Sequence, residues 1–128
     1  MKRLSLASLA AFACACAATG LSPAGSKVVP VTAQPSAQCQ TLGQVIGHGG
    51  GFWTGGMTTN ENLAISAVHD ANNKAAEMGA THLQTNPPQF AASGQGTTTS
   101  ATVTGVAYKC PPGSGAPADS AVTGGVPK

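Results

Sequence analysis

The sequence predicts a small α+β domain with the order β-α-β-β, in which one helix packs on a three-stranded sheet between disordered flanks. Three observations predict this fold. Segment 58–78 combines a helix-capping motif with apolar residues at helical spacing. Three short segments are rich in β-forming residues: 39–47, 80–85 and 101–109. The segments 17–38 and 111–128 have no pattern of period 2 or 3.6.

Composition limits the size of the domain and the classes of function. The chain has 128 residues, including 17 Gly and 9 Pro, so it has room for one small domain with irregular flanks. Lys2 and Arg3 lie in an N-terminal signal, and the remaining four lysines balance four acidic residues. These lysines are scattered singly, whereas nucleic-acid binding requires clustered lysine and arginine. The composition therefore argues against nucleic-acid binding.

Residues 1–16 have the pattern of a secretory signal peptide. Lys2 and Arg3 precede an apolar run over 4–13, and small residues follow this run. The run is too short to cross a bilayer, which takes roughly 20 apolar residues. We therefore expect the protein to be exported.

Two cysteines near the end of this signal indicate a lipid anchor. Cys14 and Cys16 each follow small residues, as the acylated cysteine of a bacterial lipoprotein does. We expect lipidation of Cys16, with Cys14 as the alternative, and acyl chains there would hold the protein on a membrane. Ala17 after Cys16 favours the outer membrane. Cleavage after an Ala-x-Ala triplet would instead give a soluble periplasmic or secreted protein.

The segments flanking the domain are rich in small residues and proline. Because 17–38 lacks a periodic pattern, we expect a flexible linker that lets the domain stand off a membrane. The tail, 111–128, is rich in Gly, Ser, Ala and Pro, and we expect it to be disordered.

The first strand, 39–47, is followed by a glycine-rich segment, 48–56, that carries His48, Phe52 and Trp53. Its place between a strand and a helix suits a phosphate-binding loop, but no Gly-Lys-Ser/Thr follows. The main interpretation is a flexible crossover loop whose aromatic side chains pack on the core. The alternative is a contact loop that presents these side chains, above all the indole, to a partner, a glycan or a membrane.

The helix carries signals at both ends. Thr58 and Glu61 match the N-cap and third positions of a capping box. Asp70 and Lys74 stand four residues apart, in the order that favours an ion pair. Gly79 is the residue type expected just past a helix end. Apolar residues recur along one face: Leu63, Ala67, Val68, Ala71, Ala75 and Met78.

The other strands follow the helix. Segment 80–85 is the second strand, and it should run parallel to 39–47 because a helix connects them. Segment 89–100 is polar and lacks a period, so we expect a loop. Segment 101–109 is the third strand, which we expect to be antiparallel.

Cys39 and Cys110 lie at the two ends of this domain. If the first and third strands are antiparallel neighbours, the start of one lies beside the end of the other and the cysteines meet. A disulfide closing a loop of about 70 residues adds roughly 4 kcal/mol in the chain-entropy model, to a domain whose core is marginal. We predict this disulfide; two free thiols are the alternative.

No pattern in the sequence indicates catalysis or metal binding. His48, His69 and His82 do not pair at i, i+4, and no cysteine or carboxylate joins them at a metal-binding spacing. No serine lies in a Gly-x-Ser-x-Gly motif. We therefore predict that the protein is not an enzyme and holds no metal or cofactor.

Three segments resemble a family of Gram-negative envelope lipoproteins that is defined only as a domain of unknown function. They are Cys39-x-x-Leu42-Gly43-x-Val45-x-Gly47, Asn73-Lys74-Ala75-Ala76-x-x-Gly79-Ala80 and Gly105-Val106-Ala107-Tyr108-Lys109-Cys110. More distantly, they are similar to outer-membrane lipoproteins that sense envelope stress for the Rcs phosphorelay. The resemblance implies an exported lipoprotein with a small α/β domain at 39–110, and it implies no catalytic residue.

The expected function is therefore that of a noncatalytic lipoprotein domain in the envelope of a Gram-negative bacterium, on the periplasmic face of the outer membrane. Its N-terminal lipid would hold it on the membrane, and the domain would contact an envelope protein or a surface. Two alternatives stay open. One is a stress-sensor or signalling lipoprotein, and the other is a small-ligand-binding or enzymatic domain that uses 48–56.

Overall fold

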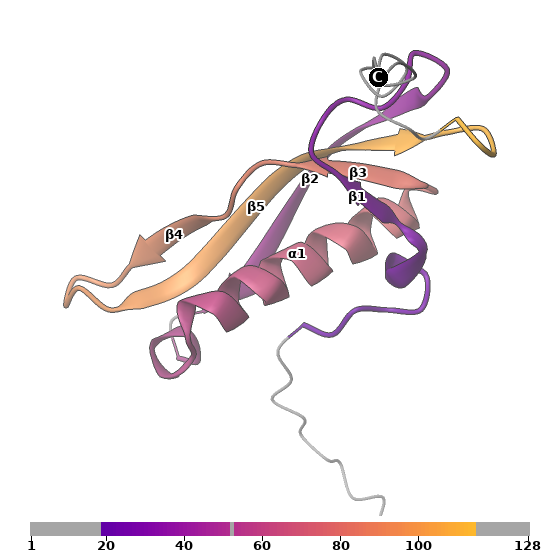
Figure 1. Ribbon diagram of the computed structural model, residues 1–128. Coiled ribbons are helices and arrows are strands. Elements are labelled where there is room, and N and C mark those ends of the chain that lie inside the picture. The colour runs from indigo at the N-terminus through magenta and orange to yellow at the C-terminus, as the bar shows by residue number, and fades with distance from the viewer. Residues whose placement is uncertain (1–18, 52, 115–128) are drawn as a thin grey trace, which may run out of the picture.

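One helix lies across one face of a twisted sheet of five strands (Figure 1). The computed structural model describes residues 19–51 and 53–114. The predicted α+β class is confirmed, but the sheet has five strands instead of three. The elements, in chain order, are η1 (Gly25–Lys27), β1 (Val29–Val31), β2 (Gln40–Gly50), η2 (Gly55–Met57), α1 (Asn60–Glu77), β3 (His82–Thr85), β4 (Gln89–Ala92) and β5 (Thr98–Lys109).

Strand β5 is the centre of the sheet. Strand β2 pairs with it antiparallel on one side, from Gln40 opposite Lys109 to Gly50 opposite Ser100. On the other side, β3 pairs with the second half of β5 and β4 with its first half, both antiparallel. Strand β1 pairs parallel with β3. The strands β2 and β3 that α1 connects are therefore parallel, as predicted, but β5 lies between them.

Two short strands lie where the sequence predicts no regular structure. Strand β1 lies inside 17–38, so the prediction of a flexible linker is wrong for this part of the chain. Val28 beside it is 3% exposed and belongs to the core. Strand β4 lies inside the predicted loop 89–100 and forms a hairpin with β5. Strands of three or four residues are too short to show a period of two, so the sequence pattern could not predict them. They are fixed by their pairing partners, β3 for β1 and β5 for β4.

The core between α1 and the sheet is built from small residues. On the helix, Ala67, Ala71 and Ala75 are fully buried one turn apart. On β2, a Cβ atom at Gly47 would collide with the Ala67 carbonyl, and one at Gly49 would collide with the Leu63 carbonyl. The helix backbone thus rests directly on the strand. The glycines of β2 serve this close packing, so His48–Gly50 form strand and not the predicted loop.

The helix begins one residue later than predicted and ends where predicted. The N-cap is Thr59, whose hydroxyl accepts a hydrogen bond of 3.3 Å from the Asn62 amide. The predicted cap, Thr58, instead donates its hydroxyl to the Thr54 carbonyl at 3.1 Å and so closes the preceding turn. At the other end Gly79 has φ +83°, and the Ala80 amide donates back to Ala75 at 3.0 Å.

The predicted disulfide between Cys39 and Cys110 is confirmed. It joins the start of β2 to the end of β5, with the two Cα atoms 4.1 Å apart. Just beyond it, the Ser36 hydroxyl donates to the Ser114 carbonyl at 2.7 Å. The predicted disordered tail therefore starts with four residues, 111–114, that fold back on the domain, and the rest of that prediction lies outside the described residues.

Candidate functional site

A cleft of about 680 Å³ lies beside the first half of α1. Three parts of the chain line it: the first described residues, the turn between β2 and α1, and the helix itself. We call this the N-terminal cleft. Its lining is made mostly of glycine and of side chains with hydroxyl or amide groups: Thr19, Gly20, Gly50, Thr54, Thr58, Asn62, Leu63, Ile65, Ser66 and His69.

The N-terminal segment is fastened to α1 at this cleft. The His69 Nδ1 atom lies 3.0 Å from the Thr19 carbonyl oxygen, to which it must donate because a carbonyl only accepts. One turn further along α1, the Asn73 side chain donates to the Gly20 carbonyl at 2.9 Å and accepts from the Ser22 amide at 2.8 Å. The chain is therefore tied to the domain from Thr19 onward, and the prediction of a flexible linker is wrong for 19–38; residues 17 and 18 lie outside the described residues.

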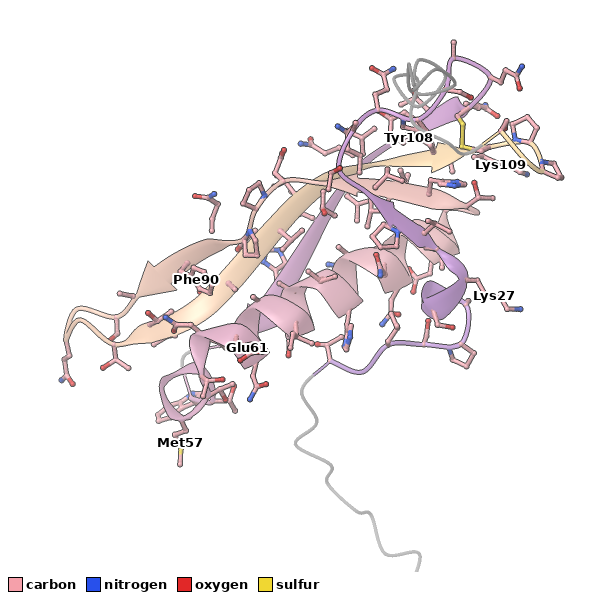
Figure 2. The ribbon with its side chains drawn as sticks, in the orientation of Figure 1. Lys27, Met57, Glu61, Phe90, Tyr108 and Lys109 are labelled. Carbon is pink, nitrogen blue, oxygen red and sulfur yellow. A yellow bond between two sulfur atoms is a disulfide. The ribbon has the colours of Figure 1, made fainter. Side chains whose placement is uncertain are left out.

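Large apolar side chains are exposed around the cleft. Trp53 is 85% exposed and Met57 is 91% exposed, and each precedes a threonine that lines the cleft. Ile65, which lines the cleft, is 43% exposed. Leu21, which follows the lining residue Gly20 in the sequence, is 40% exposed. Figure 2 shows Met57 at one end of the molecule, opposite the end that carries Lys109.

The exposure of Trp53 contradicts the main interpretation of the glycine-rich segment and agrees with its alternative. A Cβ atom at Gly55 would collide with the Thr99 carbonyl, so the turn lies directly on β5. That close approach leaves no space beneath the turn for an indole ring. Phe52, the other aromatic residue of the predicted contact loop, lies outside the described residues.

His48, the third residue of the predicted contact loop, is not near this cleft. Its neighbours Gly47 and Gly49 face α1, so the exposed His48 side chain projects from the opposite face of the sheet. The other histidines are also apart: His69 contacts Thr19, and His82 Nδ1 lies 2.8 Å from the Thr81 hydroxyl. Across residues 19–51 and 53–114, no group of three metal-binding side chains is found.

An ion pair on α1 covers part of the outer edge of β2. The sequence predicts the ion pair but not its contacts with the strand. Asp70 and Lys74 form the predicted i, i+4 pair, 2.7 Å apart. The same carboxylate accepts from the His48 amide at 2.9 Å, and the ammonium donates to the Ile46 carbonyl at 2.9 Å. Because an open strand edge can pair with another chain, these contacts protect β2 from unwanted pairing.

The electrostatics of this edge favour an ionised carboxylate. Burial raises the pKa of Asp70, but the hydrogen bonds from Lys74 and from the His48 amide, together with the nearby positive charge of Lys74, lower it by more. The net result is a pKa below the ordinary value of 3.8. Asp70 is therefore a charged acceptor for the strand edge at neutral pH.

The fold and the site define a small disulfide-bonded α+β domain with exposed apolar side chains beside the N-terminal cleft. The chain belongs to a family described as a domain of unknown function (DUF4156), whose model matches residues 19–110. The match begins at the residue that His69 holds, and it includes β1. No curated protein and no solved structure matches the chain. Within the described part, no helix is both long and apolar enough to cross a membrane.

Proposed function

We propose that this protein is a noncatalytic lipoprotein of the bacterial cell envelope and that its domain is an interaction module. The observation that carries the proposal is the exposure of Trp53 and Met57 beside the N-terminal cleft. The signal-like pattern of residues 1–16, which lie outside the described residues, supports export and an anchor on Cys16. The disulfide between Cys39 and Cys110 suits an oxidising compartment outside the cytoplasm.

Backbone contacts restrain the turn that carries the two exposed side chains. The Gly55 amide donates to the Gly51 carbonyl at 2.8 Å, and the Met57 amide donates to the Thr54 carbonyl at 3.3 Å. The packing of Gly55 on β5 adds a further restraint. A preorganised turn loses little conformational entropy when its side chains are buried by a partner. Tryptophan is among the residues that contribute most to such interfaces, and methionine adapts to irregular surfaces.

The glycines of 48–56 no longer favour a ligand-binding loop. Gly47 and Gly49 lie against the helix backbone, and Gly50 lies against Leu63 and Thr99. A phosphate-binding loop instead needs amides that converge on open space at a helix N-terminus. Close packing explains Gly49, Gly50 and Gly55, whereas an added Cβ at Gly51 or Gly56 would make only ordinary contacts. The interaction module is the function that we retain.

The test is site-specific photo-crosslinking in intact cells of the source bacterium. A photoreactive residue replaces Met57 in one variant and Gln40 in the control. Both positions are exposed, and Gln40 pairs with Lys109 at the opposite end of the molecule (Figure 2). We expect adducts with protein or lipid from position 57 and at least about a fivefold lower yield from position 40. Equal yields, or no adduct from position 57, would contradict a contact surface at the N-terminal cleft.

A further inference from the structure

We infer that the end of the domain with the N-terminal cleft lies against the lipid surface in which the N-terminal acyl chains are anchored. This inference rests on the proposed function, because it takes Cys16 as the acylated residue. It identifies the partner of the exposed Trp53 and Met57 side chains as the bilayer interface.

The anchoring segment is very short. Two residues separate Cys16 from Thr19, so three residue steps of extended chain span at most about 11 Å. An anchor on Cys14 lengthens this reach to at most about 18 Å. Helix α1 has 18 residues and is about 27 Å long. With either anchor, the attachment point of the domain lies closer to the lipid than one helix length.

The attachment point is fixed on one side of the helix. His69 and Asn73 hold Thr19, Gly20 and Ser22 by the three hydrogen bonds described above. A free linker would let the domain rotate and present any face to the membrane. A chain fastened to α1 instead directs the side of the helix that carries His69 toward the anchor.

The chemistry of that side suits a membrane interface. Thr19 shares the lining of the cleft with Thr54, Thr58 and Ile65, so the anchored segment and the turn lie at one site. Trp53 and Met57 adjoin Thr54 and Thr58 and are the most exposed large apolar side chains of the described residues. Indole rings favour the boundary between lipid and water, where the ring is buried and its N–H stays hydrated. The apolar side chains therefore lie on the side that the anchor turns toward the bilayer.

The single tryptophan of the chain makes the inference measurable. Trp53 emission is recorded from the full lipidated protein in vesicles of phosphatidylethanolamine and phosphatidylglycerol, with and without brominated acyl chains. We expect the brominated acyl chains to quench the emission. We also expect acrylamide to quench the emission at least roughly twofold more weakly than in the same protein with a long Gly-Ser insertion between residues 18 and 19. The insertion keeps the lipid and the domain but removes the short connection.

A charge variant and its matched control separate the surface from the tether. Met57→Asp should reduce bromine quenching of Trp53, because a carboxylate is poorly tolerated at the apolar interface. Gln40→Asp at the far end should not change it. The inference is overturned if bromine does not quench Trp53 emission and acrylamide quenches it equally with and without the insertion. If the crosslinks from position 57 are then to protein, the interaction module stands with a protein partner. If mass analysis finds no acyl group on Cys16 or Cys14, the anchor in the proposed function is wrong as well.

Discussion

The His69 ring nitrogen Nδ1 donates to the Thr19 carbonyl oxygen at 3.0 Å, across 50 positions of the sequence. This contact changes the expected relation between the domain and its N-terminal segment. A linker of 22 residues, 17–38, would have separated anchor and domain. The observed contact places Thr19 on the folded domain, three positions after Cys16, the residue that we propose is acylated.

Loss of the fastening side chains should release the N-terminal segment. In an Asn73→Ala variant we expect the Ser22 amide to exchange its hydrogen at least about tenfold faster, because its acceptor is removed. Hydrogen exchange followed by mass spectrometry measures this. The control is Asn62→Ala, which alters another side chain of the same cleft. Unchanged exchange in Asn73→Ala would show that the segment is held by other contacts.

A side chain at the glycines of β2 should destabilise the domain strongly. We expect Gly47→Ala to lower the free energy of unfolding by about 3 kcal/mol, because the new Cβ collides with the Ala67 carbonyl and α1 must move away. Urea unfolding followed by circular dichroism measures the change. Gly94→Ala is the control, since no atom lies within 4 Å of its added Cβ. Equal stabilities for the two variants would contradict the close packing of α1 on β2.

Removal of the disulfide should weaken the domain without changing its fold. For the double variant Cys39→Ala and Cys110→Ala, the chain-entropy model predicts a loss of roughly 4 kcal/mol for a sequence separation of 71 residues. Thermal unfolding with and without reductant checks this prediction. The reductant should destabilise the native protein and leave the double variant unchanged. If the reductant has no effect on either, the two cysteines are not joined in the native protein.

The ion pair at the edge of β2 should limit self-association. We expect the double variant Asp70→Ala and Lys74→Ala to form concentration-dependent oligomers, because the amide of His48 and the carbonyl of Ile46 lose their partners. Light scattering over a concentration series detects this. The variant Lys27→Ala and Glu77→Ala also removes one charge of each sign and should stay monomeric. Identical behaviour of the two variants would show that the pair does not protect the edge.

The same carboxylate should contribute a pH dependence at the acidic end. Because the pKa of Asp70 is lowered in the folded protein, its contribution to stability is complete above about pH 4 and is lost as pH falls through the lower folded value. We therefore expect native stability to fall toward pH 2 more steeply than that of Asp70→Asn. Chemical unfolding at a series of pH values tests this, and parallel curves would contradict it.

The parts of the fold that depend on neighbouring residues could be predicted from the sequence. The helix, its end at Gly79 and the Asp70–Lys74 pair all follow from spacings of three to five residues. The disulfide followed from strand order. Strand β1 could not be predicted, because three residues show no period and its partner β3 lies more than 50 positions away.

The candidate site was predicted only in part, for a similar reason. An exposed Trp53 was the alternative interpretation of segment 48–56, and the structure shows this exposure. The sequence of a glycine-rich segment does not reveal whether its aromatic side chains are buried in the core or exposed to solvent. The backbone contact between Gly55 and Thr99 decides that, and it joins distant segments. The fastening of Thr19 by His69 gave no sequence signal, since a lone histidine on a helix does not reveal a partner 50 positions away.

We propose that an acylated cysteine lies directly before the folded domain. Mass spectrometry of the mature protein, purified from envelopes of the source bacterium and digested near its N-terminus, tests it most directly. We expect an N-terminal peptide that begins at Cys16 and carries the mass of a diacylglyceryl group and an added acyl chain. An unmodified peptide that begins at any residue between Cys14 and Thr19 would contradict it.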